Sequence, residues 1–166
     1  VIGAGHQQAL VTLNERKSRY ALIAHVPSKS AEVVSEAMIS LLTPFAARVH
    51  TLTTDNGKEF AGHERIAQIL DADFFFAHPY ASWERGANEN MNGLIRQFFP
   101  KRMRFDSITA QQVAFAMHRL NHRPRKCLGF KTRHEALHEA ATLVITPLHF
   151  RVATASTCYQ LTARKG

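Results

Sequence analysis

The order of its short apolar segments is the feature that most limits what this chain can fold into. Two segments rich in Leu, Val, Ile and Thr, at residues 9–14 and 20–26, come first and are joined by a short charged turn. Strands joined in this way are expected to pair antiparallel. After Pro27, segments with helical periodicity alternate with shorter strand-like segments. This order predicts a mixed α/β domain.

The later elements follow from apolar periodicity and from the residues that start and stop helices. Apolar residues recur at helical spacing in four segments, so we expect helices at about 31–42, 63–70, 88–99 and 109–121. Short β-rich segments predict strands at 50–54 and 73–77. A basic loop is expected at 122–131.

Size, charge and cysteine content limit the class of protein. A chain of 166 residues suits one domain, and no apolar run approaches the ~18–20 residues that a membrane span needs. Lys and Arg number 21 against 13 Asp and Glu, a net charge of +8, which favours a polyanionic partner such as nucleic acid. Two cysteines cannot form a disulfide framework and fit a reducing cytoplasm.

The first candidate for chemistry is a carboxylate at a predicted strand end. Asp55 follows the strand at 50–54 and precedes Asn56 and Gly57. Ligands bind at such strand ends in α/β folds, but Asn-Gly is also a strong turn signal. By itself, the segment fits an ordinary turn as well as it fits a site.

The second candidate is the helix predicted at 88–99. Helical spacing puts Glu89, Asn92, Gly93 and Arg96 on one side, opposite the apolar Met91, Leu94, Ile95 and Phe98. A solvated helix face would give the same pattern. However, the one helix and one strand between Asp55 and Glu89 can bring both carboxylates together. Converging carboxylates need a cation, and hard ions such as Mg²⁺ prefer oxygen ligands.

Four segments resemble the insertion-sequence transposases of the "thirty" family. They are residues 54–60 (TDNGKEF), 78–97 (HPYASWERGANENMNGLIRQ), 120–126 (LNHRPRK) and 15–20 (ERKSRY). The resemblance covers about residues 1–137. It implies a ribonuclease-H-like integrase fold, a mixed sheet flanked by helices, and a DDE mechanism of DNA nicking and strand transfer.

Carried over position by position, the resemblance makes Asp55 the second aspartate and Glu89 the glutamate of the metal-binding triad. These two residues are therefore the predicted catalytic and metal-binding residues, for Mg²⁺ or Mn²⁺, with two ions in the complete enzyme. Arg96 occupies a basic position near the DNA end. Asn92 and the basic residues of the loop are further predicted DNA contacts, namely Arg123, Arg125 and Lys126.

The resemblance also implies partners and a location. Double-stranded DNA, both transposon ends and target, would be the substrate, and the protein would act as a homo-oligomer in the bacterial cytoplasm, with no membrane attachment. For the basic loop, phosphate contact and a plain solvated loop are equally good interpretations.

The chain departs from the family at both ends. The resemblance calls for a first aspartate ahead of residues 1–3, and no aspartate occurs from Val1 to Thr54. Glu15, in the predicted turn, is a poor substitute. We therefore expect a catalytic core at 1–140 that lacks its first-strand aspartate and is impaired, followed by a divergent tail at 141–166. The alternative is a non-catalytic DNA-binding or oligomerisation remnant.

Two further departures concern single residues. Arg133 stands where the family generally has a proline. His118 and His122 lie four residues apart, as do His134 and His138, but no cysteine or carboxylate lies at zinc-finger spacing. The sequence alone therefore does not favour a zinc site.

Overall fold

The computed structural model describes residues 8–77, 90–100, 103–143 and 147–154. Its helices and strands alternate as the sequence predicts, with two additions near the C-terminal end. In chain order the elements are β1 (Ala9–Glu15), β2 (Ala21–Val26), α1 (Ala31–Leu42), η1 (Thr43–Arg48), β3 (Val49–Thr54), η2 (Lys58–Phe60), α2 (His63–Leu70), β4 (Asp73–Phe76), a helix at 90–95, η3 (Phe105–Ser107), α4 (Ala110–Asn121), η4 (Lys126–Leu128), α5 (Arg133–Leu143) and β5 (Leu148–Thr154).

The strands form one mixed five-stranded sheet in the order β2-β1-β5-β3-β4. β1 is antiparallel to both of its neighbours, β2 and β5. β3 is parallel to both β4 and β5. The predicted antiparallel pair and the predicted mixed α/β class are therefore confirmed.

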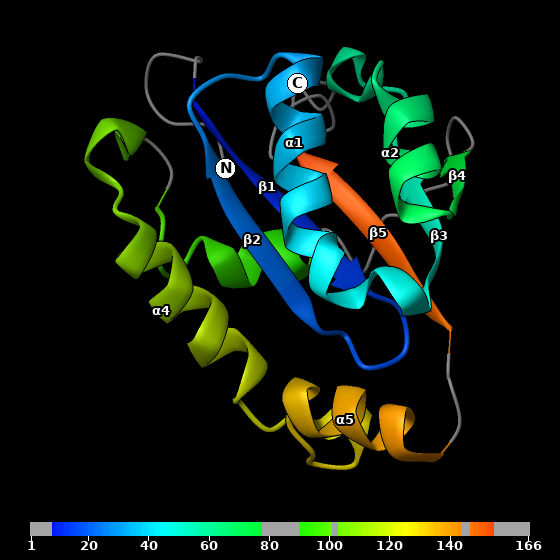
Figure 1. The fold of residues 1–166 in the computed structure, drawn as a ribbon. Coiled ribbons are helices and arrows are strands. Elements are labelled where there is room, and N and C mark those ends of the chain that lie inside the picture. The colour runs from blue at the N-terminus through cyan, green and yellow to red at the C-terminus, as the bar shows by residue number, and fades with distance from the viewer. Residues whose placement is uncertain (1–7, 78–89, 101–102, 144–146, 155–166) are drawn as a thin grey trace, which may run out of the picture.

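The last strand lies in the middle of this sheet (Figure 1). β5 comes from the segment expected to diverge, yet Leu148, Phe150 and Val152 are all buried in the main core. His149 and Arg151, which alternate with these three residues, point to the other face of the sheet. This alternation of apolar and polar residues is the pattern of a strand inside a sheet.

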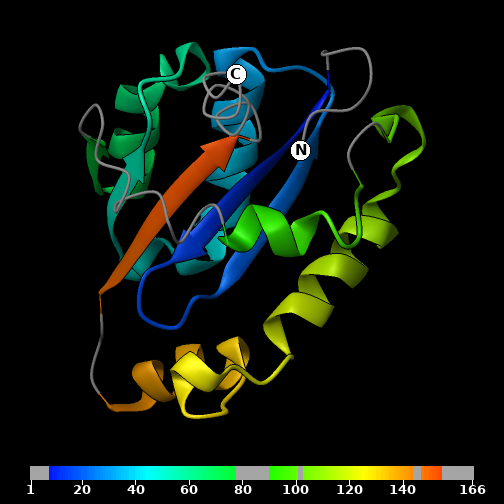
Figure 2. The same ribbon diagram turned by 180° about the vertical axis from the view of Figure 1, so that it is seen from behind.

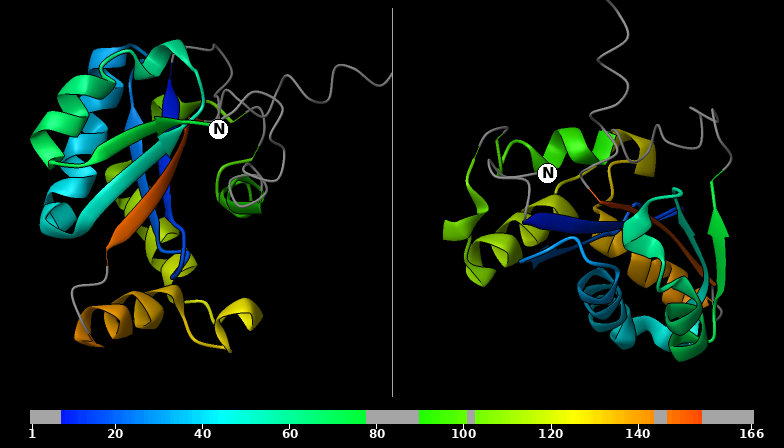
Figure 3. Two further views of the ribbon diagram at one scale, coloured as in Figure 1. Left: turned by 90° about the vertical axis from the view of Figure 1, so that its right-hand side faces the viewer. Right: turned by 90° about the horizontal axis from the view of Figure 1, so that it is seen from above.

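Helices cover both faces of the sheet. On one face, α1 and α2 pack over a core that includes Leu13, Leu52 and Phe150 (Figure 1). On the other face, the 90–95 helix and α4 pack over Leu10 and Ile23 (Figure 2). The edge-on views in Figure 3 show these layers on either side of the sheet. In the described part of the chain, no helix has both the length and the apolar character to cross a membrane.

The helix ends are fixed by capping residues. Ser30 accepts a hydrogen bond from the Val33 amide at the start of α1. At the start of α4, Thr109 and Gln112 bond each other's backbone amides, at 3.2 and 2.9 Å. Such reciprocal caps satisfy amides that a helix start leaves unpaired. The predicted helices at 31–42 and 109–121 are confirmed to within one residue.

Asn121 ties the end of α4 to the edge strand β2. Its Oδ1 accepts from the Ala21 amide at 2.9 Å, and its Nδ2 donates to the Ala21 carbonyl at 2.8 Å. The side chain is buried, at 2% exposure. One amide side chain therefore satisfies both backbone groups of an edge residue, which would otherwise be buried without partners.

We expect Asn121→Ala to destabilise the fold. Two buried backbone groups would lose their partners, each at roughly 1–3 kcal/mol, so the free energy of unfolding should fall by about 2–6 kcal/mol. Urea denaturation followed by circular dichroism measures this change. Gln112→Ala, which removes only an exposed cap, serves as the control and should cost about 1 kcal/mol. An Asn121→Ala loss no larger than the control's would contradict this account.

Candidate functional site

Asp55 lies at the carboxyl end of β3, a strand with a parallel neighbour on each side. The Ala77 amide donates to the Thr54 carbonyl at 2.7 Å, so pairing with the β4 side reaches the last residue of β3. Asp55 is half-buried, and its Oδ1 atom is shielded from solvent. The carboxylate thus sits at a rigid strand end, the position that the sequence predicts.

The chain after Asp55 does not make a hairpin turn. Gly57 has φ −72° and ψ 142°, which is ordinary extended backbone, and neither Asn56 nor Gly57 has a positive φ. Instead η2 follows, and its Phe60 is buried in the core. A Cβ at Gly57 would lie 2.6 Å from Oε2 of Glu59, so this glycine leaves room for the Glu59 carboxylate.

Polar side chains line the middle strands on the face away from α1 and α2. Because Leu52 points into the core under those helices, Thr51 and Thr53 point to the other face. The same alternation directs Asp55 to that face. By the same argument, β5 presents two polar residues there, His149 and Arg151.

The first strand continues this polar surface. Val11 and Leu13 belong to the core under α1, so Thr12 and Asn14 face the opposite way, and both are buried. We call the set Thr12, Asn14, Thr51, Thr53, His149 and Arg151 the polar strip. Across it, Thr51 Oγ1 and His149 Nδ1 lie 2.7 Å apart, within hydrogen-bonding distance.

The 90–95 helix packs against the same face of the sheet. Met91 and Ile95 are buried beside Leu10, as the predicted apolar side requires. Asn92, predicted to face outward on the polar side, is instead buried at 7% exposure. Arg96 is half-buried. Glu89 immediately precedes this helix and lies outside the described residues.

Gly93 lies on the exposed side of this helix. A Cβ built on it would meet nothing within 4 Å. The glycine is therefore not needed for packing within the described structure. The open space beside it leaves room for the close approach of a ligand.

The other predicted DNA contacts lie at the opposite end of the sheet. α5 ends at Leu143, and β5 begins at Leu148, which pairs with Val49, the first residue of β3. The α4–α5 loop with Arg123, Arg125 and Lys126 is near that end (Figure 1). The structure therefore does not bring these three residues together with Asp55.

Arg133 is a buried arginine that links α5 to the 90–95 helix. It is 2% exposed, and its Nη1 lies 3.5 Å from the Met91 sulfur. Burial, followed by repulsion from Arg125, lowers the pKa of Arg133 to about 10. Its Nε has no hydrogen-bond partner among the described residues. The sequence marked Arg133 as unusual but did not reveal this contact.

The carboxylate of Asp55 is a donor of the kind that holds a hard cation. Carboxylate and amide oxygens suit Mg²⁺ or Mn²⁺, and Asp55 offers one carboxylate on the face of the sheet against which the 90–95 helix packs. Within the part of the chain that the structure describes, no three His, Cys, Asp or Glu side chains are placed to hold a metal ion. A complete site at this strand end needs a further acidic group.

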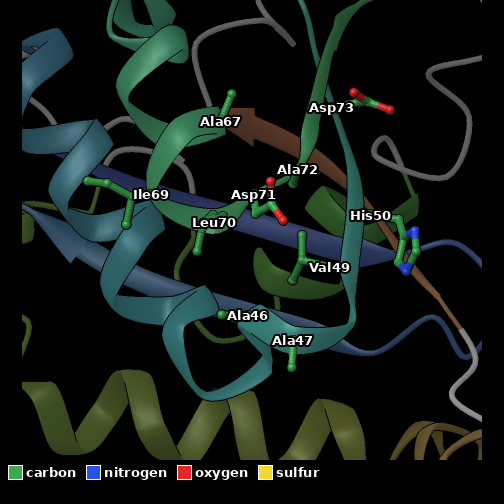
Figure 4. A pocket seen from close by; sticks show the side chains of 10 residues that line it. All are labelled: Ala46, Ala47, Val49, His50, Ala67, Ile69, Leu70, Asp71, Ala72 and Asp73. Atoms are coloured by element: carbon green, nitrogen blue, oxygen red, sulfur yellow. The ribbon is translucent and has the colours of Figure 1, made fainter.

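An open hollow of about 550 Å³ lies elsewhere, between the start of β3 and the end of α2 (Figure 4). His50, Asp71 and Asp73 line it together with apolar residues such as Val49 and Ile69. None of the predicted site residues lines it. Its position at the start of β3 separates it from Asp55.

No protein-family model matches the chain, but curated proteins do. It is 46% identical over 135 residues to the transposase for insertion sequence element IS4351 of Bacteroides fragilis, covering 81% of this chain and 41% of that protein. It is 36% identical over 135 residues to transposase InsI for IS30A of Escherichia coli, covering 81% and 35%. The transposase for IS1086 of Cupriavidus metallidurans is 33% identical over 146 residues, covering 87% and 42%.

The chain therefore spans 35–42% of the length of these relatives. Among solved structures, the catalytic core domain of BIV integrase matches with a TM-score of 0.60 and 20% identity, over 84% of this chain and 98% of that one. An intasome of simian T-cell lymphotropic virus matches with a TM-score of 0.58 and 16% identity, over 83% and 56%. The ribonuclease-H-like fold and the resemblance to IS30-type transposases are both confirmed.

We expect acid to destabilise the fold through His149 in the polar strip. Burial, and then the nearby Arg16, lowers its pKa below the ordinary value of 6.5. Between the two values the unfolded chain binds more protons than the folded chain, so the free energy of unfolding should fall as the pH drops below about 6.5. Urea denaturation at pH 7.5, 6.5 and 5.5 measures this dependence.

His149→Gln should make the dependence shallower without abolishing it, because the pKa of His25 and that of His134 are also lowered by burial. His118→Gln is the matched control, since His118 is exposed on α4 and is not among the groups that shift the pKa of His149. A His149→Gln profile as steep as that of the control would contradict this assignment.

Proposed function

We propose that this chain, a homologue of IS30-type transposases with an integrase-core fold, is the larger part of a catalytic core that nicks DNA at transposon ends and transfers the freed strand to target DNA. The observation that carries this proposal is the position of Asp55. It ends β3 on the face of the sheet against which the 90–95 helix packs. That helix immediately follows Glu89 in the sequence.

The proposed metal ligands are Asp55 and Glu89, and Mg²⁺ is the ion that their oxygens suit. A bound pair of such ions supplies an activated water or 3′-hydroxyl and a stabilised leaving oxygen. In this proposal the chain itself holds Asp55 at a fixed strand end. Its half-buried Arg96 pairs with the DNA backbone beside the site.

We further propose that the chain by itself is impaired in catalysis. The polar strip offers threonine, asparagine, histidine and arginine, but no carboxylate. Residues 1–54 contain no aspartate that could serve as the third acidic ligand. Two carboxylates would hold a metal pair less tightly, and in a less defined geometry, than three.

The second candidate function is a DNA-binding or oligomerisation remnant without catalysis. Two observations favour it. The net charge of +8 suits a polyanion regardless of chemistry. In addition, the residue that β5 places opposite Thr53 is the cation Arg151, not an acidic group. DNA binding without nicking is the behaviour that separates this candidate from the first.

Metal-dependent nicking of supercoiled DNA tests the catalytic proposal. The chain alone would be compared with a form extended upstream by the corresponding segment of the Bacteroides relative. We expect only the extended form to nick in Mg²⁺, and Asp55→Asn or Glu89→Gln to reduce its nicking to background. Asp73→Asn, an exposed aspartate on the neighbouring strand, should have no effect. DNA binding by the extended form without nicking would favour the remnant.

The salt dependence of DNA binding tests the basic loop. If Arg123, Arg125 and Lys126 contact phosphates, each alanine substitution should weaken binding and reduce the slope of log K against log salt by about 1. Fluorescence anisotropy over a range of NaCl concentrations measures the slope. Arg65→Ala is the control, because that arginine lies in α2 and already pairs with Glu36 of α1. Slopes equal to that of the control would contradict phosphate contact and would mean that the loop is only a solvated connection between α4 and α5.

A further inference from the structure

Four histidines from two helices form one continuous row at the junction of α4 and α5. The ring centroids of His118 and His122 are 4.0 Å apart, and those of His122 and His134 are 4.8 Å apart. The row ends with His138, 4.3 Å from His134. His118 lies in the last turn of α4 and His122 is the residue that caps its end, whereas His134 and His138 lie in α5.

The backbone that carries the row is anchored on both sides. Asn121 bonds to Ala21, and Leu120 is buried in the core beneath α4. On α5, Leu137 lies between the two histidines in sequence and is buried in the main core. Each pair is spaced by four residues, the spacing that puts two imidazoles on one side of a helix and that metal-binding helices use.

The rings are accessible, and at least one is already oriented by the backbone. His118, His122 and His138 are exposed, and His134 is half-buried. His122 Nδ1 lies 3.0 Å from the His118 carbonyl, so it can donate to that oxygen. An imidazole that donates from Nδ1 presents Nε2 as an acceptor, the form in which histidine binds metals.

The two carboxylates near the row already have other partners, so imidazole nitrogens are its main potential metal ligands. Glu139 pairs with Lys131 at 2.6 Å, and Glu135 accepts from the Thr132 amide at 2.7 Å. Arg119 and Arg123 are exposed cations on the α4 side.

We propose that these four histidines bind one divalent transition-metal ion of the Zn²⁺ or Ni²⁺ class, which would clamp α5 to the end of α4. Imidazole nitrogens suit these ions, and four of them match a tetrahedral Zn²⁺ site. In the described structure the rings stack, and no three ligands already converge on one point. Binding therefore turns the rings about their side-chain torsions, and the ring torsion of histidine is broad.

This site is independent of the proposed catalytic centre. It lies near the start of β3 and β5, whereas Asp55 follows the end of β3 (Figure 1). Its ligands are nitrogens, whereas those proposed at Asp55 are oxygens. Mg²⁺ should therefore not compete for it, and Asp55→Asn should leave it intact.

Isothermal titration calorimetry tests the proposal: the full chain, prepared without a histidine tag, is titrated with Zn²⁺ and, separately, with Ni²⁺. We expect one ion per chain, no competition from Mg²⁺, and weaker binding at pH 5.5 than at pH 7.5 because protonated imidazole cannot ligate. Loss of a group that only supports a metal ligand already lowers metal affinity about 10–100-fold. The double substitutions His118→Ala/His122→Ala and His134→Ala/His138→Ala each remove two proposed ligands. Each should therefore lower the affinity for the ion about 100-fold or more. His50→Ala is the matched control and should bind as the parent does.

X-ray absorption of the bound ion distinguishes a shared site from separate pairs, even if one variant folds poorly. Three or four imidazole ligands on one ion support the proposal. Two ions per chain, two imidazoles per ion, or affinity unchanged by either double substitution would overturn it. Absence of binding at pH 7.5 would overturn it as well.

Discussion

The pairing of β5 with both β1 and β3 holds the two halves of the structure together. β1 and β2 form an antiparallel pair, and β3 and β4 form a parallel pair. In the strand order, β5 is the neighbour that these two pairs share. The core beneath α1 spans both pairs, so it is continuous only because Phe150 and Val152 fill its centre. The position of Asp55 at a strand end with a parallel neighbour on each side follows from the same pairing.

Much of this architecture could be predicted from the sequence because local signals and packing agree. The helices α1 and α4 were predictable because Ser30 and Thr109 cap them and apolar residues recur along one side. β5 was missed, although Leu148, Phe150 and Val152 alternate with polar residues over one short segment. Such a segment carries little weight alone, because its partners are more than 90 residues away in sequence. α5 was missed because its apolar periodicity is weak.

The parts of the candidate site that depend on local sequence were predictable, and the parts that depend on tertiary packing were not. Asp55 at a strand end required only the strand pattern and the carboxylate that follows it. The burial of Asn92 could not be foreseen, because helical spacing says which residues share a side but not how far a neighbouring sheet covers it. The histidine row is a similar case. Each pair is visible in the sequence, but their meeting depends on how α5 packs against α4.

The long sequence separation between β5 and its partner strands has a consequence for how the protein is made. β1 cannot gain its second neighbour until residues 148–154 have left the ribosome. Until then, the inner edges of β1 and β3 expose unpaired backbone groups, which in other proteins promote association between chains. Contacts between such distant segments also slow folding. The nascent chain therefore completes its sheet only after β5 has been made, and until then it is most exposed to chaperones and to aggregation.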